Sequence, residues 1–361
     1  MSLRLAIAAG GTGGHLFPAQ ALAETALARG WDVRLLSDAR GLGYAQGFPE
    51  AVARHQIASA SPARGGLTGL IGLPVTIARG VVAAARLFRA HRVGVLAAFG
   101  GYPTFPPLIA ARLLGVPAIL HEQNAVLGSV NRRFARSVRA VACGIWPVLN
   151  APAGARLERI GNPVRAAVLA AAERPYVPAG AGQIRLLVFG GSQGASVFAR
   201  LAPAAVAALP EGLRRRLEVT QQIRPGEQET VASAYAAVGI TAELAPFFAD
   251  LPDRIAASHL VLARAGASTV AEIAAIGRPS ILVPLPSAAA DHQTANARSL
   301  ADPRPAILAP EARLDAPTLA ADLAAILTDP DRAARMATAA RAAGTPDAAD
   351  RLADLVAAAA R

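Results

Sequence analysis

Short runs of apolar residues alternate with longer amphipathic stretches along the chain. The runs span four to seven residues, the length of a buried strand, and most stretches between them have helical periodicity. Because apolar strands that alternate with helices are typical of parallel sheets, this pattern predicts an α/β fold. The runs lie at residues 3–9, 33–36, 93–99, 118–121, 138–142, 184–189, 217–220, 260–263 and 280–283.

Two of these runs begin similar segments about 180 residues apart. The run at 3–9 leads into Gly10-Gly-Thr-Gly-Gly-His15, and the run at 184–189 leads into Gly190-Gly-Ser-Gln-Gly-Ala195. A helical stretch follows each glycine loop. A repeated unit of strand, glycine loop and helix predicts two doubly wound, Rossmann-like domains in tandem.

The boundary between these domains is expected near Gly161-Asn-Pro-Val-Arg165, before an Ala-rich stretch that contains prolines. We therefore expect an N-terminal domain at residues 1–163 and a C-terminal domain at 164–340. Residues 341–361 are expected to form a C-terminal helix, which can pack back on the N-terminal domain.

The composition excludes several classes of protein. Cys143 is the single cysteine and cannot form an internal disulfide, and all 36 basic residues are arginine. Without lysine the chain has neither a Walker A loop nor a Schiff-base lysine. Glycines end the first apolar run too early for a secretion signal, and no run of about 20 apolar residues predicts a membrane span.

The net charge of +11 is concentrated in the first half of the chain. Residues 1–165 hold 18 arginines and 6 acidic residues, whereas residues 166–361 hold 18 arginines and 19 acidic residues. A basic half is typical of proteins that meet nucleic acid, an anionic membrane or a phosphorylated substrate. Nucleic acid is disfavoured, because the chain has no recognition motif with interleaved aromatic residues.

A basic and apolar segment lies between Glu50 and Glu122, where seven arginines occur without an acidic residue. On a helix from about Val75, Arg79 and Arg86 share a face. Such a face suits an anionic bilayer surface, where each basic residue adds about 1 kcal/mol. A core helix with a solvated arginine edge explains the same pattern. The candidate membrane residues are Leu70, Ile71, Leu73, Val75, Arg79 and Arg86.

The glycine loops are candidate phosphate sites. Leu16 stands where the dinucleotide fingerprint needs its third glycine, which disfavours a nicotinamide dehydrogenase. Glycine lets backbone N–H groups at a helix start approach a pyrophosphate, although it also suits an ordinary tight turn. His15 ends the first loop, as either a general base for a hydroxyl or a capping residue.

Polar residues also follow later apolar runs. Glu272 falls one turn into a helix expected from about Ser268, where it either binds a ribose diol or stabilises the helix dipole. His121-Glu-Gln-Asn124 and Asp291-His-Gln293 place polar groups at a predicted cleft rim. Their spacing does not suit a metal, so we expect no metal and no cofactor.

Seven motifs, in this order, resemble the bacterial glycosyltransferases that add N-acetylglucosamine to lipid I to give lipid II in peptidoglycan synthesis. The resemblance spans residues 1 to about 300. The motifs are Gly10–His15, Phe99-Gly-Gly-Tyr-Pro-Thr104, His121–Asn124, Gly161–Arg165, Gly190–Ala195, Arg264-Ala-Gly-Ala267, and Asp291–Gln293 with Asn296. Two positions depart from the family pattern: Ala263 replaces a frequent serine, and Ala290 replaces a frequent acidic residue.

The resemblance implies a GT-B fold, with two Rossmann-like domains facing an interdomain cleft. The donor UDP-N-acetylglucosamine is then held mainly by the C-terminal domain, with Phe248 against uracil and Glu272 on the ribose. The implied donor contacts are Arg165, Gly191, Ser192, Gln193, Phe248, Ala267, Ser268, Thr269, Glu272, His292 and Gln293. The implied acceptor contacts are Thr12, Gly13, Gly14, His15, Gly100, Gly101, Tyr102 and Asn124, and the implied catalytic residues are His15, Asn124 and Glu272.

The reaction implied by the resemblance is an inverting, metal-free displacement in which His15 takes the proton of the acceptor hydroxyl. The implied partners are UDP-N-acetylglucosamine, lipid I and the cytoplasmic face of an anionic membrane, on which the enzyme is peripheral. The alternatives are a UDP-N-acetylglucosamine 2-epimerase of the same fold, a transferase acting on another lipid, and a membrane-peripheral protein that only binds nucleotide sugars. The epimerase would need no membrane-facing segment.

Overall fold

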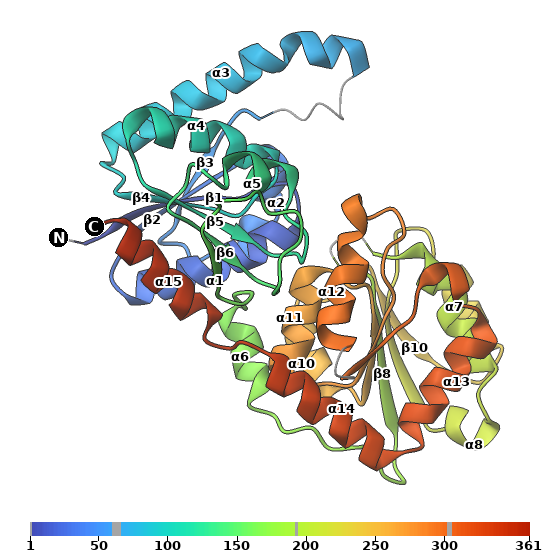
Figure 1. Cartoon of the computed structure of the whole chain (residues 1–361). Helices are drawn as coiled ribbons and strands as arrows, with labels where there is room; N and C mark the ends of the chain where they lie inside the picture. The colour runs from blue at the N-terminus through green and yellow to red at the C-terminus, as the bar shows by residue number, and fades with distance from the viewer. Residues whose placement is uncertain (1, 60–65, 192–193, 302–304) are drawn as a thin grey trace. The chain divides into compact units, whose positions relative to one another are not determined.

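The apolar runs form the interior of two parallel sheets in a computed structural model that describes residues 2–59, 66–191, 194–301 and 305–361 (Figure 1). One sheet has seven strands in the order β3-β2-β1-β4-β5-β6-β7, and the other has six in the order β10-β9-β8-β11-β12-β13. Every pairing between described strands is parallel. The predicted fold class of doubly wound α/β domains is therefore confirmed.

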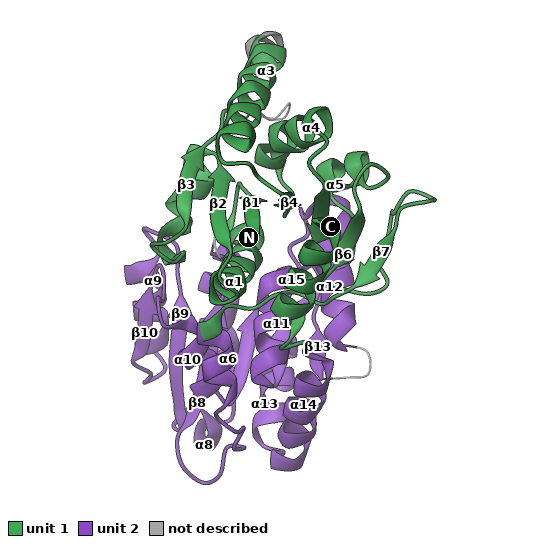
Figure 2. Cartoon of the chain, turned by 90° about the vertical axis from the view of Figure 1, so that its left-hand side faces the viewer, with its two compact units in different colours: residues 1–166, 345–361 green, residues 167–344 purple. Residues whose placement is uncertain are grey.

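The chain divides into two compact units, each built on one sheet (Figure 2). Unit 1 contains residues 1–166 and 345–361, and unit 2 contains residues 167–344. The divisions predicted from the sequence fall after residues 163 and 340.

Unit 1 contains the seven-stranded sheet and six helices among its described residues. Its strands are β1 Arg4–Ala8, β2 Asp32–Ser37, β3 Ala53–Gln56, β4 Val95–Ala98, β5 Ala118–Glu122, β6 Ala140–Cys143 and β7 Leu157–Arg159. Its helices are α1 Gly13–Ala28, α2 Ala39–Gly43, α3 Gly66–Ala90, α4 Phe105–Leu114, α5 Ser129–Phe134 and α15 Ala348–Ala359.

Unit 2 contains the six-stranded sheet, and α6 joins it to unit 1. Its strands are β8 Ile184–Phe189, β9 Leu217–Gln222, β10 Ala242–Ala245, β11 Leu260–Ala263, β12 Ser280–Leu282 and β13 Ala306–Leu308. The helices are α6 Ala166–Ala172, α7 Ser196–Ala207, α8 Glu211–Arg214, α9 Gln228–Ala236, α10 Leu251–Ala257, α11 Ala267–Ile276, α12 His292–Ala301, α13 Ala316–Leu327 and α14 Pro330–Ala343. Short 3-10 helices occur at Ala45–Gly47, Tyr102–Thr104, Ala289–Asp291 and Glu311–Arg313.

Helices cover both faces of the sheet in unit 1 (Figure 1). Leu5 and Ile7 of β1 pack in one core cluster with α1 and α15. Ala6 and Ala8, which point to the opposite face, pack with α3, α4 and α5. Because both faces are buried, the central strands are apolar without alternation, as is typical of parallel sheets.

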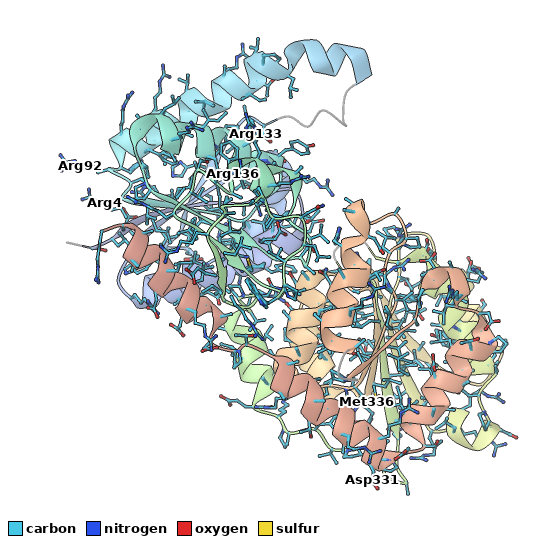
Figure 3. All side chains as sticks on the ribbon, viewed as in Figure 1. Arg4, Arg92, Arg133, Arg136, Asp331 and Met336 are labelled. Carbon is cyan, nitrogen blue, oxygen red and sulfur yellow. The ribbon has the colours of Figure 1, made fainter. Side chains whose placement is uncertain are left out.

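The sheet of unit 2 is covered in the same way. The core cluster on one face joins β8 to α7, α9 and α13, and Figure 1 shows α10, α11 and α12 on the other face. Helix α14 is amphipathic: Met336 is buried in the core, whereas Asp331 is exposed in the first turn, and both are labelled in Figure 3.

Residues 345–361 bring the chain back to unit 1 after unit 2 is complete. Leu352, Ala353 and Val356 of α15 are fully buried against the first sheet. Arg29, just after α1, forms ion pairs with Asp350 at 2.9 Å and with Asp354 at 2.6 Å. Unit 1 is therefore built from two stretches of sequence that are separated by the whole of unit 2.

Candidate functional site

Each sheet has one point where the strand order reverses, and each glycine loop lies there. In unit 1 the chain runs from β1 through β2 to β3 on one side and returns to β4 on the other side of β1. In unit 2 it runs from β8 to β10 on one side and returns to β11. The carboxyl ends of strands at such a reversal form the usual ligand crevice of doubly wound sheets. The loops after β1 and β4, and those after β8 and β11, are therefore the candidate sites.

In unit 1 the loops after β1 and β4 pack so closely that they require glycine. A Cβ atom on Gly10 would lie 2.2 Å from Cγ of Pro103, and one on Gly101 would lie 2.9 Å from the carbonyl oxygen of Gly10. Gly100 and Gly101 also have positive φ angles of 86° and 79°. Thr12 adopts an extended conformation immediately before α1 begins at Gly13. These predicted acceptor residues thus lie together, with Tyr102 exposed beside them.

His15 lies in the first turn of α1, against the second of these loops. Its ring atoms Cε1 and Cδ2 lie 3.4 Å from the positions that Cβ atoms would take on Gly100 and Gly101. Its Nδ1 lies 3.2 Å from Oε1 of Gln123, which follows β5. The predicted catalytic histidine is therefore held between the carboxyl ends of β1, β4 and β5.

The polar run His121–Asn124 is largely buried at the end of β5. The Glu122 carboxylate accepts bonds from the backbone and side-chain nitrogens of Asn124, at 3.1 and 3.2 Å. It also accepts bonds from the backbone of Gly128 at 2.8 Å and the amide of Asn131 at 2.9 Å. One carboxylate therefore holds the whole loop that carries Asn124.

His121 is a structural histidine. It is fully buried, its Nε2 lies 3.2 Å from the carbonyl oxygen of Gly161, and its Nδ1 has no hydrogen-bond partner among the described residues. Burial lowers its pKa from 6.5 to about 4, because the charged imidazolium is poorly solvated there. His121 is therefore neutral at physiological pH.

This lowered pKa predicts loss of stability in mild acid. The unfolded chain takes up a proton on His121 below about pH 6.5, whereas the folded chain resists it down to about pH 4. Stability is therefore full above pH 6.5 and falls as the pH decreases, by about 2 kcal/mol between pH 7 and pH 5. Urea unfolding at the two pH values measures this change.

The His121→Gln variant provides the control for this prediction. It should lose most of this pH dependence and keep the smaller contributions of His55 and His259, whose pKa values burial also lowers. An unchanged difference between pH 7 and pH 5 in the variant would show that His121 is not its source.

In unit 2 the glycine loop after β8 folds back on itself. A Cβ atom on Gly190 would lie 2.3 Å from the backbone nitrogen of Ala195, and Gly191 has a φ angle of 78°. Gln222, at the end of β9, accepts a bond from the N–H of Gly190 at 3.0 Å and donates to the carbonyl of Gly191 at 3.1 Å. The predicted contacts Ser192 and Gln193 lie outside the described residues.

The start of α11 lies beside this loop, because β8 and β11 are neighbouring strands. Ala267, Ser268 and Thr269 form the first turn of α11, at the positive end of the helix dipole. A Cβ atom on Gly191 would lie 3.9 Å from Oγ1 of Thr269. Glu272 follows one turn later and is 4% exposed. The structure thus brings these predicted donor residues to one edge of the second sheet.

The predicted sugar contacts lie at the start of α12, after β12. His292 is half-buried, with Nδ1 2.8 Å from the carbonyl oxygen of Ala289. Oε1 of Gln293 accepts a bond from the backbone of Leu285 at 3.0 Å. The short 3-10 turn directly before His292 has Ala290 and Asp291 in the left-handed region, with φ angles of 52° and 51°.

Phe248 and Arg165, two predicted donor residues, do not have the surroundings that the sequence predicts. The ring of Phe248 is buried under the guanidinium of Arg254, at 4.3 Å, so that this ring has no open face for a base. The adjacent Phe247 is 68% exposed instead. Arg165 belongs to unit 1 rather than to the second domain, and its guanidinium lies 4.2 Å from the ring centre of Phe17 in α1.

Helix α3 presents a stripe of basic and apolar side chains to solvent. The buried side packs on the core and on α4, and a Cβ atom on Gly80 would lie 2.2 Å from the carbonyl oxygen of Ala58. Leu73 is half-buried, and the side chains of Leu70 and Ile71 lie outside the described part of the chain. The exposed stripe, with residues three or four apart, is Val75, Arg79, Val82, Arg86 and Arg89.

The described residues contain neither a cluster of metal ligands nor a membrane-spanning helix. No three His, Cys, Asp or Glu side chains are grouped as metal ligands there. None of the helices described has both the length and the apolar character needed to cross a bilayer.

Comparisons with known proteins define the class of this molecule. Residues 5–143 match the glycosyltransferase family 28 N-terminal domain, and residues 185–352 match the glycosyltransferase family 28 C-terminal domain. Each match contains one of the two glycine loops. Family 28 glycosyltransferases are therefore the class to which the fold and the sites point.

Full-length relatives narrow this class. The chain is 49% identical to a UDP-N-acetylglucosamine--N-acetylmuramyl-(pentapeptide) pyrophosphoryl-undecaprenol N-acetylglucosamine transferase of Rhodospirillum centenum, over 98% of this chain and 93% of the relative. The crystal structure of Acinetobacter baumannii MurG is 28% identical, with a TM-score of 0.78 over 99% of this chain and 100% of that chain. The chain belongs to this family of N-acetylglucosamine transferases, and the expected GT-B fold is confirmed.

A third comparison concerns the epimerase alternative. The structure of a UDP-GlcNAc 2-epimerase from Neisseria meningitidis, bound to UDP-GlcNAc, has a TM-score of 0.69 over 99% of this chain and 100% of that chain. It is only 10% identical to this chain, so this likeness shows a shared fold alone.

Sequence reasoning placed Gln123 at the cleft rim within His121–Asn124 but gave it no role of its own, and it assigned no role to Gln222 or Phe247. Gln123 and Gln222 each lie two residues after the end of a predicted strand, where a buried amide has few reasons to occur other than to bond nearby loops. This position after a strand is the sequence signal by which both residues could have been identified. No sequence signal distinguishes the exposed Phe247 from the buried Phe248.

Proposed function

We propose that this chain transfers N-acetylglucosamine from UDP-N-acetylglucosamine to the muramyl sugar of lipid I. The observation that carries the proposal is the 49% identity over nearly the full length to a transferase whose name specifies this donor and this acceptor. The two glycine loops support it, since each opens a helix at the strand reversal of its unit and suits a diphosphate group.

Unit 2 is the proposed donor unit. The glycine loop after β8 and the first turn of α11 are proposed to bind the diphosphate of UDP, because the positive end of a helix dipole favours an anion. Glu272 is proposed to accept bonds from the ribose hydroxyls, and the exposed ring of Phe247 to stack on uracil beside the backbone of Phe248. His292 and Gln293 are proposed to meet the sugar, together with Ser192 and Gln193 on the diphosphate.

Unit 1 is the proposed acceptor unit. The loops at Thr12–Gly14 and Gly100–Tyr102 are proposed to surround the lipid pyrophosphate and the muramyl sugar. Asn124, fixed by Glu122, is proposed to orient the acceptor hydroxyl. Arg165 is proposed to meet the donor diphosphate, as the family resemblance implies, with its guanidinium packed against Phe17.

The proposed reaction is a single displacement. The 4-hydroxyl oxygen of the muramyl sugar attacks the anomeric carbon of N-acetylglucosamine, while the bond from that carbon to UDP breaks and its electron pair leaves with UDP. The hydroxyl proton passes to His15. Attack opposite the leaving group inverts the configuration and gives a β-1,4 link. Charge that develops on UDP is stabilised by the N–H groups of the glycine loop and α11.

Substitution of Gly190 by alanine tests the donor loop. The new Cβ would lie 2.3 Å from the backbone nitrogen of Ala195, so the loop must move. Its N–H groups would then no longer point to the bound diphosphate. We expect kcat/KM for UDP-N-acetylglucosamine to fall by about 10²-fold. The matched control is Gly212→Ala, whose Cβ meets nothing within 4 Å. Equal kinetics in the two variants would contradict a donor role for this loop.

The transfer itself is tested by following radiolabelled N-acetylglucosamine from its UDP ester to a lipid I analogue, with EDTA present. A product with a β-1,4 link establishes the acceptor and the inverting course. A protein that binds UDP-N-acetylglucosamine but transfers to no lipid I analogue would contradict the proposal. Interconversion of the donor with its 2-epimer would identify the epimerase instead.

We further propose that unit 1 attaches peripherally to the cytoplasmic face of an anionic membrane. The supporting feature is the exposed stripe of α3, in which Val75 is 55% exposed and alternates with Arg79, Val82 and Arg86. Apolar groups beside arginine suit the boundary between lipid headgroups and acyl chains. Other arginines of unit 1 at the surface, labelled in Figure 3, include Arg133 and Arg136.

Charge reversal tests this attachment. The double variant Arg79→Glu and Arg86→Glu removes two favourable contacts of about 1 kcal/mol each and adds repulsion. Binding to phosphatidylglycerol vesicles in a sedimentation assay should therefore weaken by roughly 30-fold or more at low salt. The exposed Arg335→Glu of unit 2 is the control and should bind as the wild type does. Vesicle binding that is equal in all three proteins would contradict the proposal.

A further inference from the structure

The side chain of Gln123 connects the proposed general base to the backbone of a neighbouring strand. It is 1% exposed and bonds to His15 at one end and to the carbonyl of Phe99 at the other. We propose that Gln123 is a positioning residue that fixes the tautomer of His15, with the proton on Nδ1 and the lone pair on Nε2. The catalytic consequence rests on the proposed role of His15, whereas the tautomer itself does not.

The orientation of the Gln123 amide follows from its acceptors. Its nitrogen Nε2 lies 2.9 Å from the carbonyl oxygen of Phe99 and 3.5 Å from that of His121. Carbonyl oxygens only accept hydrogen bonds, so the NH2 group of the amide must point to them. The oxygen Oε1 is therefore the end that faces His15. The backbone of Gln123 is held as well, because its own carbonyl accepts a bond from Asn162 at 2.9 Å.

The tautomer of His15 follows from the orientation of this amide. Oε1 of Gln123 is an acceptor only, and it lies 3.2 Å from Nδ1 of His15. A neutral imidazole can satisfy this acceptor only if Nδ1 carries the proton, which leaves the lone pair on Nε2. Without a partner at Nδ1, the ring would be free to carry its proton on either nitrogen.

The basic nitrogen then faces the proposed acceptor loop. Nε2 lies in the ring between Cε1 and Cδ2, the two atoms that pack 3.4 Å from the Cβ positions of Gly100 and Gly101. Within the described residues, the hydrogen bonding of the His15 ring is confined to Nδ1. The nitrogen that can take a proton is thus on the ring edge next to the loop proposed to hold the muramyl sugar.

A neutral amide at this position differs from the carboxylate that orients many catalytic histidines. A carboxylate would favour the imidazolium as well as the tautomer, whereas an amide favours the tautomer alone. His121, a titratable group that interacts with His15, is kept uncharged by burial, with a pKa of about 4. Glu122 points to Asn124, Gly128 and Asn131 instead of to His15.

The first test observes the tautomer directly. The chain contains six histidines, so [15N]histidine labelling gives few imidazole signals, and the His15→Gln variant identifies those of His15. In the unliganded wild-type protein near pH 8, we expect a protonated Nδ1 and an unprotonated Nε2. A proton on Nε2, or a mixture of tautomers, would overturn the proposal whatever the rates of the enzyme.

The second test uses two variants of Gln123. Gln123→Met keeps the size of the side chain but removes the acceptor, so the Nδ1–H form should lose its dominance and kcat should fall by about 10- to 100-fold. KM for UDP-N-acetylglucosamine should stay unchanged. Gln123→Glu should restore the Nδ1–H form and move the acid limb of the kcat profile to higher pH, by about one unit or more.

The two variants also separate the two proposals. A tautomer that changes in Gln123→Met while kcat is retained would support the role of Gln123 and contradict the role of His15 as the base. A tautomer that persists in Gln123→Met would overturn the role of Gln123, even if His15 is essential. The wild-type spectrum decides the assignment should either variant fail to fold.

Discussion

Replacing His15 by alanine is expected to lower kcat by about 10²- to 10⁴-fold, which is the usual contribution of a general base. The physical reason is that the muramyl hydroxyl is a weak nucleophile until its proton is removed, and Nε2 of His15 is the proposed acceptor. The KM for UDP-N-acetylglucosamine should change little, because the proposed donor residues other than Arg165 are in unit 2, whereas His15 is in unit 1. Steady-state kinetics with a lipid I analogue measure both constants.

The matched control is His91→Ala. His91 follows α3 in the same unit, and its ring packs near that of His55, away from the glycine loops. Its substitution should leave kcat unchanged. A His15→Ala enzyme that retains kcat within threefold of the wild type would remove the histidine from the proposed mechanism, and a proportional loss in both variants would indicate a general effect on folding.

Replacing Arg278 by methionine is expected to destabilise unit 2 by about 3 kcal/mol. Arg278 is 1% exposed and donates to the carbonyls of Ala256, Ile276, Gly277 and Arg174. The first three belong to the C-terminal ends of α10 and α11, and Arg174 lies just beyond α6. One guanidinium therefore neutralises the negative ends of three helices.

The charge of Arg278 persists despite its burial. Burial lowers its pKa from 12.5 to about 10, which still leaves it protonated at neutral pH. Methionine fills a similar volume but donates no hydrogen bonds. The buried carbonyl oxygens are then left without donors, and this accounts for the expected loss of stability. Urea unfolding and hydrogen exchange in α10 and α11 measure it. The exposed Arg335→Met is the control and should change stability by less than about 0.5 kcal/mol.

The strands that sequence reasoning identified are those in the interior of each sheet. Interior strands have helices on both faces and are mostly apolar, as in Ile184–Phe189. The strands it missed are β3, β7, β10 and β13, which are the four edge strands of the described sheets. Three of them contain exposed charged or polar residues: Ala53–Gln56, Leu157–Arg159 and Ala242–Ala245. The fourth, Ala306–Leu308, is apolar but only three residues long. Periodicity therefore recovered the centre of each sheet and not its rim.

The part of the candidate site that could be predicted from the sequence is the pair of glycine loops, because their backbone geometry requires glycine. The loops at Gly10 and Gly190 were identified because few other residues allow the close approaches seen at these positions. The bonds that orient the site were not predictable, since they join residues far apart in the chain. The bond from Gln123 to Phe99 spans 24 residues, and that from Gln222 to Pro246 also spans 24. Such pairs depend on which strands become neighbours.

The return of α15 to unit 1 imposes an order on folding during synthesis. Leu352, Ala353 and Val356 complete the core on one face of the first sheet, yet the ribosome makes them only after all of unit 2. The sheet of unit 1 therefore emerges early, but the part of its apolar face that α15 covers stays exposed while residues 167–344 are translated. Unit 2, although translated later, is the first to have its whole sequence available. A nascent chain that stalls between these stages exposes that apolar face to chaperones and to aggregation.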